Sequence, residues 1–291
     1  MKGVLIMKQY KVNATNIGGE TITYRKAGSG SNTVLLIHGN MSSSAHWQTT
    51  MEALEEEYTL YAADIRGFGD SSYNAGFDSL KELAWDISQL IDAVGIGKCT
   101  VVGWSAGGGV AMELAAMRPE LVEKVITIGS VPITGFPMFK KDAQGAPILD
   151  QPLKTKEDIA TDPVQVAPVL AALAEGNREF MRMIWNMAIY SMVQPPADDF
   201  EIYLDAMMKE RCLVDLNYSL LTFNMTTRLD ELKCPAVMLQ GEKDYVVTLE
   251  MARQSQKDMG GKAKLITFEN WGHSPMTDDL EGFVAALRQE L

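Results

Sequence analysis

Short, uninterrupted apolar runs rich in β-branched residues recur along this chain, and they constrain its fold more than any other feature. They are TVLLIHG, YTLYAAD, CTVVGW, KVITIGS, AVMLQG and KLITFEN. A run of this kind, without polar alternation, predicts a strand that is buried on both faces. Because helical patterns lie between the runs, the sequence predicts a mostly parallel sheet with helices on both faces.

Two further patterns extend this predicted sheet. The alternating stretches KQYKVNAT and ETITYRKA, separated by NIGG, predict an opening β-hairpin that adds antiparallel strands at one edge. Residues 79–94 keep a 3.6-residue apolar period, and Ser79 and Glu82 at its start predict a helix with a capping box. We therefore expect an eight-stranded sheet.

The alternation of strands and helices breaks once, between Ser130 and about Arg228. This stretch has no buried-strand run and turns helical through APVLAALAEGNREFMRMIWNMAIYSMV and DDFEIYLDAMMKERCLVDL. We predict a core domain of residues 1–130 and 229–291, with residues 131–228 inserted as a helical cap domain. Many methionines fall in this cap, where they either fill gaps between helices or line a pocket adaptably.

Charge and hydropathy limit the partners of the chain. The formal net charge is −12 at pH 7 and no Lys/Arg-rich run occurs, so a nucleic-acid backbone would be repelled. Because no signal-like segment or long apolar stretch is evident, we expect a cytoplasmic monomer or homodimer that does not enter a membrane. The chain can also start naturally at Met7, in which case residues 1–6 are an extension.

The cysteines and histidines give no sign of a metal or redox centre. Cys99, Cys212 and Cys234 are far apart and lack CxxC or Cys/His ligand spacing. We interpret them as buried reduced thiols. With three histidines in the whole chain, the sequence predicts no metal and no cofactor.

The strongest chemical motif is Gly103-x-Ser105-x-Gly107, at the point where CTVVGW runs into AGGGVAMELAAMRPE. A nucleophilic serine of this type sits on a strained turn between a strand and a helix, and small residues on either side let the two elements approach. The glycines at 107–109 therefore predict close packing. Neither this stretch nor AGSGSN spells GxGxxG, which argues against a dinucleotide site.

A serine hydroxyl at neutral pH needs a base, most often histidine. His273 in NWGHSPM follows the last strand, at the edge of the sheet where Ser105 also lies, and we predict that it is the base. His38 in LLIHGN is expected to order its loop by hydrogen bonding. His46 in SSSAHWQ is expected to cap a helix or to line the entrance.

The base in turn needs an acceptor that fixes its tautomer. Asp244 in AVMLQGEKDYVV follows the penultimate strand, and Ser, Asp, His is the chain order of a nucleophile-elbow hydrolase. The alternative for Asp244 is a turn-forming aspartate. Asp64 in YAADIRGFGDSS also follows a strand, but it precedes Ser105 and is predicted to belong to a buried turn network.

An oxyanion intermediate needs hydrogen-bond donors already in place. We predict that the backbone N–H of Ala106, at a helix N-terminus, is one donor and that the N–H of Asn40 in HGNMSSS is the other. The N–H of Met41 is the fallback for the second donor. Candidate substrate contacts are Met41, Trp47, Trp104, Trp185, Met187 and Tyr190.

Taken together, LLIHGN, ADIRGFGDSS, VGWSAGGG, QGEKDYVV and NWGHSP resemble the α/β-hydrolase superfamily from about residue 20 to the C-terminus. The resemblance implies an α/β-hydrolase fold with a helical cap and no required cofactor. HGNMSSSAHW, the Trp before the nucleophile, and DPVQVAPVL with IWNMAIY are similar to bacterial intracellular short-chain poly(3-hydroxybutyrate) depolymerase-like esterases. HGN-SSS and GWS-GG also resemble acyl-homoserine lactonases.

The expected activity is that of a serine esterase, a carboxylester hydrolase acting on small to medium, fairly apolar esters, with hydroxyalkanoate oligomers as one candidate. Ser105 would be acylated with His273 as general base, and water would then hydrolyse the acyl-enzyme. Alternatives are a lactonase, a perhydrolase or cofactor-free peroxidase activity on the same residues, and a non-catalytic ligand-binding relative.

Overall fold

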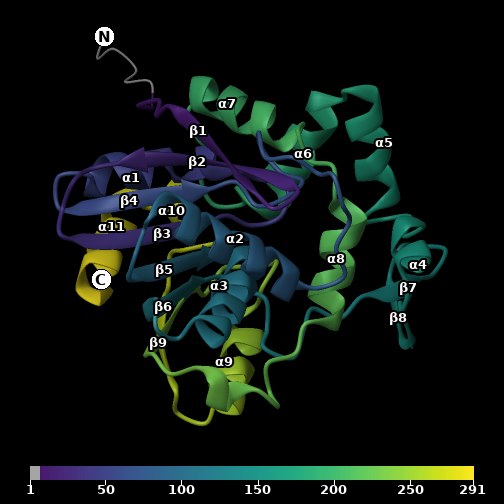
Figure 1. Ribbon diagram of the computed structural model, residues 1–291. Helices are drawn as coiled ribbons and strands as arrows, with labels where there is room; N and C mark the ends of the chain where they lie inside the picture. The colour runs from purple at the N-terminus through teal and green to yellow at the C-terminus, as the bar shows by residue number, and fades with distance from the viewer. Residues whose placement is uncertain (1–6) are drawn as a thin grey trace.

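The computed structural model describes residues 7–291, so the predicted extension at residues 1–6 lies outside the described residues. One eight-stranded sheet forms its centre, in the order β1-β2-β4-β3-β5-β6-β9-β10 (Figure 1). Its strands are β1 (Val12–Ile17), β2 (Glu20–Ala27), β3 (Asn32–Ile37), β4 (Tyr58–Ala63), β5 (Cys99–Trp104), β6 (Val122–Ile128), β9 (Ala236–Gly241) and β10 (Ala263–Phe268).

The predicted hairpin and the predicted parallel sheet are both present. β1 pairs antiparallel with β2 across the turn at Gly18 and Gly19, and β2 pairs antiparallel with β4. From β4 to β10 every neighbouring pair is parallel. The chain reaches each next parallel strand through a crossover, so the carboxyl ends of β3, β5, β6, β9 and β10 meet at one edge of the sheet.

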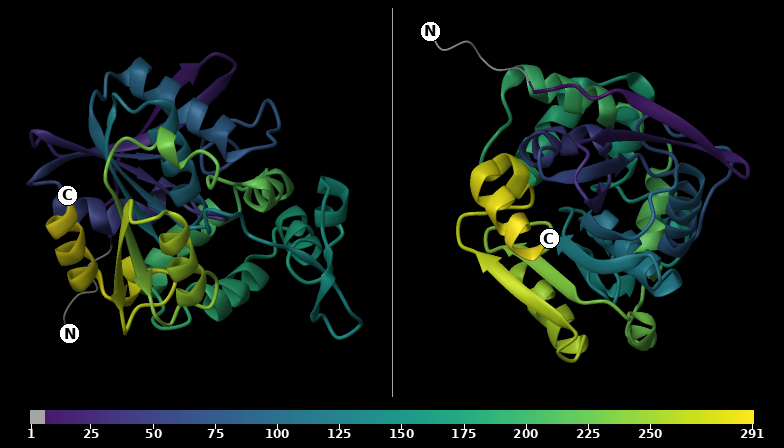
Figure 2. Two further views of the ribbon diagram at one scale, coloured as in Figure 1. Left: turned by 90° about the horizontal axis from the view of Figure 1, so that it is seen from below. Right: turned by 60° about the vertical axis from the view of Figure 1, so that its left-hand side comes forward.

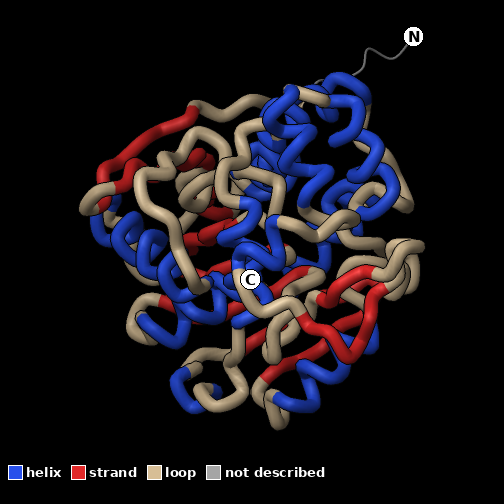
Figure 3. Tube along the Cα trace, turned by 90° about the vertical axis from the view of Figure 1, so that its right-hand side faces the viewer, coloured by secondary structure: helices blue, strands red, loops and turns tan. Residues whose placement is uncertain are grey.

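Two hydrophobic cores lie on opposite faces of the sheet, because successive strand residues point to opposite sides. On β3, Leu35 and Ile37 belong to one core, while Val34 and Leu36 belong to the other. Figures 2 and 3 show helices on both sides of the strands. The helices of the main domain are α1 (Gln48–Leu54), α2 (Leu80–Val94), α3 (Ala106–Met117), α9 (Leu249–Asp258), α10 (Pro275–Asp278) and α11 (Leu280–Glu290).

The helix predicted over residues 79–94 is α2, but the predicted capping box is wrong. The Ser79 hydroxyl donates a hydrogen bond to Glu82 Oε1 at 3.0 Å instead of accepting one from the backbone. The same Glu82 oxygen accepts from the backbone N–H of Asp78, also at 3.0 Å, and not from the backbone N–H of Ser79 as a capping box requires. A carboxylate is the stronger acceptor, and here it takes both donors.

The segment between β6 and β9 runs along the top and right of the sheet in Figure 1 and contains strands as well as helices. The expectation of helices alone is therefore incomplete. β7 and β8 form a separate antiparallel ribbon whose residues are mostly exposed, and such strands leave no buried apolar run in the sequence. The elements are β7 (Phe139–Lys141), β8 (Pro147–Pro152), α4 (Lys156–Ala160), α5 (Ala167–Glu175), α6 (Arg178–Ala188), α7 (Ala197–Met207) and α8 (Leu213–Thr222).

Two short 3₁₀ helices complete the described chain, η1 (Ser44–Trp47) and η2 (Leu229–Glu231). None of the helices within residues 7–291 is both long enough and apolar enough to cross a bilayer.

Candidate active site

Ser105 occupies the turn between β5 and α3 in a conformation that few residues other than glycine adopt. Its φ is 55° and its ψ is −120°. Hydrogen bonds hold the turn, with the Ser105 N–H donating to the carbonyl of Ile128 at 2.9 Å and the Gly108 N–H donating to the carbonyl of Ser105 at 3.0 Å. Backbone strain of this kind, maintained by its surroundings, is typical of a functional position.

The glycines around Ser105 are a packing device, as the sequence predicts. A Cβ on Gly103 would lie 2.3 Å from the carbonyl oxygen of Gly107, and a Cβ on Gly107 would lie 2.4 Å from the carbonyl oxygen of Ile37. Both separations are far below van der Waals contact. Only glycine therefore lets α3 pass this close to β5 and β3.

His273 and Asp244 are brought together from the loops after β10 and β9. His273 Nδ1 lies 2.8 Å from Asp244 Oδ2, and both side chains are buried. A carboxylate accepts hydrogen bonds, so Nδ1 carries the proton and Nε2 is left as the ring atom with a free lone pair. This is the tautomer that a general base requires.

Asp244 is held by several donors besides His273. Its Oδ1 accepts from the backbone N–H groups of Val246 and Val247 at 2.8 and 2.9 Å. Gln240 Nε2 lies 3.4 Å from Oδ2. The two backbone bonds make Asp244 part of a turn as well, so the turn-forming alternative and the partner role coincide in one residue.

Trp104, predicted as a substrate contact, also positions the histidine loop. Its indole N–H donates to the backbone carbonyl of His273 at 2.7 Å, and the two rings lie 5.7 Å apart between centroids. The polar end of the side chain is therefore used within the protein. Its apolar ring borders the cavity described below.

The two predicted oxyanion donors, Asn40 and Ala106, both border the same cavity as Ser105. The loop before Asn40 passes so close that a Cβ on Gly39 would lie 2.9 Å from the Cβ of Ser105. The fallback donor, Met41, has its N–H directed to Asn40 Oδ1 at 2.9 Å. This engagement favours Asn40 over Met41 as the second donor.

A cavity of about 460 Å³ opens above Ser105 and His273. Lysine, arginine, aspartate and glutamate are all missing from its walls within residues 7–291. Predicted contacts Met41, Trp104, Trp185 and Met187 line it. The remaining lining residues are Gly39, Val131, Phe136, Val164, Gln165, Val169, Phe180, Ile184, Ala188, Ile189, Leu213, Asn217, Leu220, Tyr245, Val246 and Val247.

Comparison with known proteins agrees with this geometry. A sequence model described as the alpha/beta hydrolase fold matches residues 32–280. The chain belongs to the α/β-hydrolase fold family. The match begins at β3 and ends at the start of α11, so it includes Ser105, Asp244 and His273 together with the segment inserted between β6 and β9.

Relatives of this hydrolase include named esterases. A pimeloyl-(acyl-carrier protein) methyl ester esterase from Aliivibrio fischeri is 27% identical over 272 residues, covering 92% of this chain and 96% of its own length. A protein of the same name from Nitrosomonas europaea is 26% identical and covers 87% of this chain and 92% of its own length. The names of these relatives support ester hydrolysis as the class of reaction.

Solved structures show the same fold at lower identity. An esterase from Exiguobacterium antarcticum superposes with a TM-score of 0.74 at 19% identity, covering 97% of this chain and 99% of its own. A probable hydrolytic enzyme from Pseudomonas aeruginosa gives a TM-score of 0.75 at 21% identity, covering 99% and 96%.

Two of the predicted substrate contacts, Tyr190 and Trp47, do not border the cavity. Tyr190 is buried behind the cavity wall, where its ring packs 5.2 Å from those of Trp185 and Phe200 between centroids. Trp47 is buried in the same hydrophobic core as Val34 and Leu36 of β3 and does not border the cavity. In both cases the apolar ring is used for packing between elements.

The other two histidines have the roles that the sequence predicts. His38 Nδ1 lies 2.8 Å from the carbonyl of Gly39, and its Nε2 accepts from the N–H of Ile65, which ties two loops together. His46 caps η1 by accepting from the N–H of Ser43 at 3.2 Å. Burial lowers the pKa of His46 to about 3, so it stays neutral.

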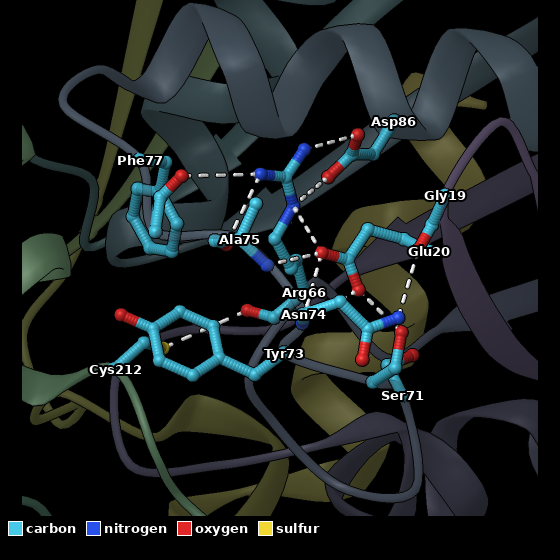
Figure 4. Close-up of polar contacts among 12 residues, drawn as sticks. Gly19, Glu20, Arg66, Ser71, Tyr73, Asn74, Ala75, Phe77, Asp86 and Cys212 are labelled. Carbon is cyan, nitrogen blue, oxygen red and sulfur yellow. Dashed lines mark hydrogen bonds and ion pairs between the residues drawn. The ribbon is translucent and has the colours of Figure 1, made fainter.

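Asp64 belongs to a buried turn network, as predicted. It accepts from the Thr23 hydroxyl at 2.7 Å and from the Ser44 N–H at 2.6 Å. The same turn carries Arg66, which pairs with Asp86 through two hydrogen bonds and lies 3.9 Å from Glu20 (Figure 4). This network fixes the loop after β4 and leaves Asp64 outside the cavity.

The cysteines are free thiols, with Cys99 and Cys212 buried and Cys234 half-buried, contrary to the expectation that all three are buried. Burial raises the pKa of Cys99 to about 12, which keeps that thiol unreactive. Among residues 7–291, no group of three His, Cys, Asp or Glu side chains is arranged to hold a metal ion.

Several cavity residues were missed by sequence reasoning. Val131 and the run Tyr245–Val247 follow β6 and β9 directly, so their place at the active edge of the sheet was available from the strand pattern. Phe180, Ile184 and Asn217 come from helices of the inserted segment. Their apolar period shows which helix face is buried, but not which neighbour it faces.

Proposed function

We propose that this carboxylester hydrolase forms an acyl-enzyme on Ser105, with His273 as general base and Asp244 as its partner. The observation that carries the proposal is the His273 Nδ1 to Asp244 Oδ2 bond of 2.8 Å, which leaves Nε2 free beside a cavity that Ser105 also borders. The imidazole takes the serine proton as Oγ attacks the ester carbonyl. The resulting imidazolium then protonates the departing alcohol.

The second half of the reaction reverses these proton transfers. Water attacks the acyl-enzyme while His273 removes its proton, and Ser105 regains its hydroxyl as the acid leaves. In both halves the negative oxygen would be stabilised by the N–H groups of Ala106 and Asn40. Ala106 begins α3, so the helix dipole adds to its effect.

The cavity favours uncharged esters with small to medium acyl groups. Its walls offer no Lys or Arg for an anionic group and no Asp or Glu for a cationic one within the described residues. Its volume of about 460 Å³ lies within the range of small-molecule sites, ~300–1,000 Å³. We assign the inserted segment, residues 131–228, as the cap domain that supplies most of this apolar wall.

Hydroxyalkanoate oligomers are a specific candidate within this class. The Asn217 amide group donates from Nδ2 to the carbonyl of Leu213 at 2.8 Å, which leaves Oδ1 available as an acceptor in a largely apolar wall. A hydroxyl on the acyl chain would supply the matching donor. The free thiols agree with a cytoplasmic setting, where the medium is reducing.

The test is hydrolysis of p-nitrophenyl esters from C2 to C12 and of amorphous hydroxybutyrate polymer. Ser105→Ala is the blank, and Ser79→Ala, outside the cavity, is the matched control. The proposal expects Ser105-dependent turnover that declines for long chains. Equal activity in wild type and S105A would overturn it, and stronger competition by acyl-homoserine lactones than by linear esters would move the substrate to lactones.

A further inference from the structure

Glu210 is a buried carboxyl group that the proposed mechanism does not use. It lies between α7 and α8 and is 6% exposed, and neither carboxyl oxygen has a hydrogen-bond partner within the described chain. Other buried acids differ in this respect, since Asp64, Asp86 and Asp244 each accept at least two hydrogen bonds. An unpaired buried polar group of this kind requires a specific explanation.

The carboxyl group of Glu210 lies against the loop that carries the proposed oxyanion donor. The backbone N–H of Met41 is the polar group that it faces. That N–H is already directed to Asn40 Oδ1 at 2.9 Å, so it completes no hydrogen bond with Glu210. Met41 has a φ of 49°, and it and Ser105 are the two residues other than glycine in residues 7–291 with positive φ.

The surroundings of Glu210 offer no counter-charge, because the nearby charged groups are bound elsewhere. Lys209 pairs with Asp70, Arg211 donates to the carbonyls of Gly69 and Ser71, and the Cys212 thiol donates to the carbonyl of Arg66. On the neighbouring loops and η1, the titratable groups and their partners are Asp64 with Thr23 and Ser44, Arg66 with Asp86, Arg25 with Ser44, His38 with Ile65, and His46 with Ser43.

Burial raises the pKa of Glu210 to about 8, so the side chain is mostly neutral at pH 7. A neutral carboxyl can remain packed against the strained Met41. An ionised one, without partner or counter-ion, must draw in water or move. Either response displaces the loop at Met41, which is adjacent to Asn40.

We propose that Glu210 is a positioning residue for the oxyanion loop and that it supports catalysis only while its carboxyl group is protonated. The inference rests on the proposed ester hydrolysis. Ionisation acts through the loop at Met41, because a shift of this loop disturbs the placement of the neighbouring Asn40 N–H. Because oxyanion donors act in the transition state, the loss falls on kcat and leaves KM largely unchanged.

The experiment measures kcat and KM from pH 6 to 10 on a soluble p-nitrophenyl ester, with Ser105→Ala as the blank. If the ionised form is inactive, the wild-type kcat falls about tenfold between pH 7 and pH 9. Glu210→Gln keeps the shape of the neutral acid and does not titrate, so its kcat stays level over this range. Glu123→Gln, an exposed control, keeps the wild-type fall.

Thermal unfolding over the same pH range gives a second readout that does not depend on catalysis. The wild-type Tm is expected to fall relative to that of Glu210→Gln as pH rises toward 8. If E210Q folds poorly, Glu210→Met serves as the second non-titrating variant. An alkaline fall of kcat in E210Q or E210M equal to that of wild type overturns the inference, whereas a wild type inactive at every pH overturns the proposed function instead.

Discussion

The two sides of the site around Ser105 differ in the kind of contact that forms them. On the side of the main domain, Asp244, His273 and Trp104 form a chain of buried hydrogen bonds between the ends of β9, β10 and β5. On the side of the inserted segment, the wall is largely apolar and is formed by side chains such as Phe180, Ile184 and Leu220. The first side fixes the orientation of individual side chains through hydrogen bonds, whereas the second sets the size and hydrophobicity of the cavity.

This difference predicts different responses to mutation. A hydrogen-bonded chain fails when one link is lost, because the reacting atoms lose their geometry. An apolar wall changes gradually with each side chain, because dispersion and burial are spread over many contacts. Changes on the main-domain side are therefore expected to reduce kcat, and changes on the inserted side are expected to alter substrate preference.

Asp244→Asn is expected to have the largest effect. The backbone N–H groups of Val246 and Val247 hold the amide oxygen at the Oδ1 position, so the amide NH2 faces His273 Nδ1 and donates to it. The productive tautomer is then lost, and kcat falls by about 10⁴-fold. KM should change little. Steady-state kinetics on a C4 ester measures this, with the exposed Asp230→Asn as control, and a loss in D244N of less than tenfold would contradict the assigned role.

Gly129→Ala tests how tightly the same pair is packed. A Cβ at this position would lie 2.9 Å from Asp244 Oδ2 and 3.2 Å from His273 Nδ1, and the φ of Gly129 is +47°. We expect kcat to fall roughly 100-fold from misplacement of the imidazole.

The control for this variant separates backbone strain from steric contact. Gly95 has a φ of +72°, and a Cβ at this position would have no atom within 4 Å. Gly95→Ala should therefore cost about 1–2 kcal/mol of stability without affecting kcat. If both variants lose stability equally and neither loses activity, the packing account is wrong.

Trp104→Phe removes the hydrogen bond to the carbonyl of His273 and keeps most of the ring. A kcat loss of roughly tenfold is expected, because a buried carbonyl is left unpaired and the loop relaxes. Trp85→Phe, on the exposed face of α2, should leave kinetics as they are. A change in KM alone for W104F would assign Trp104 to substrate contact instead of loop positioning.

Ile184→Trp is expected to have the smallest effect, and this effect falls on substrate specificity. The larger side chain reduces the cavity, so the ratio of kcat/KM for C8 over C4 esters should fall about five- to tenfold. Met183→Trp, on the same helix with its side chain exposed and outside the cavity, is the matched control. An unchanged ratio in I184W would mean that this part of the wall does not contact the acyl chain.

The same contrast explains what sequence reasoning found and what it missed. Ser105, Asp244 and His273 follow separate strands, and parallel strands end at one edge, so their meeting was predictable from the strand pattern. Tyr190 was assigned to the substrate but packs behind Trp185, because aromatic residues look alike in a sequence whether they line a cavity or fill a core. The β7–β8 ribbon was not predicted for a related reason: its residues are mostly exposed, so its strands leave no buried apolar run in the sequence.

Glu210 marks another limit of sequence reasoning. In the sequence, Glu210 is one charged residue among others after a predicted helix, and none of its neighbours indicates that it is buried. The packing of the α7–α8 connection against the loops after β3 and β4 removes it from water. Contacts between segments so far apart in the chain depend on the whole fold.

The central claim is that Ser105 becomes covalently acylated, and intact-protein mass spectrometry tests it most directly. Wild type, Ser105→Ala and Ser79→Ala are treated with a fluorophosphonate, or quenched in acid during turnover of a p-nitrophenyl ester. Each sample is weighed intact to count adducts and is then digested to locate them. The account predicts one adduct per chain, located at Ser105, in wild type and S79A and absent from S105A. An adduct on another residue, or labelling of S105A equal to that of wild type, would contradict it.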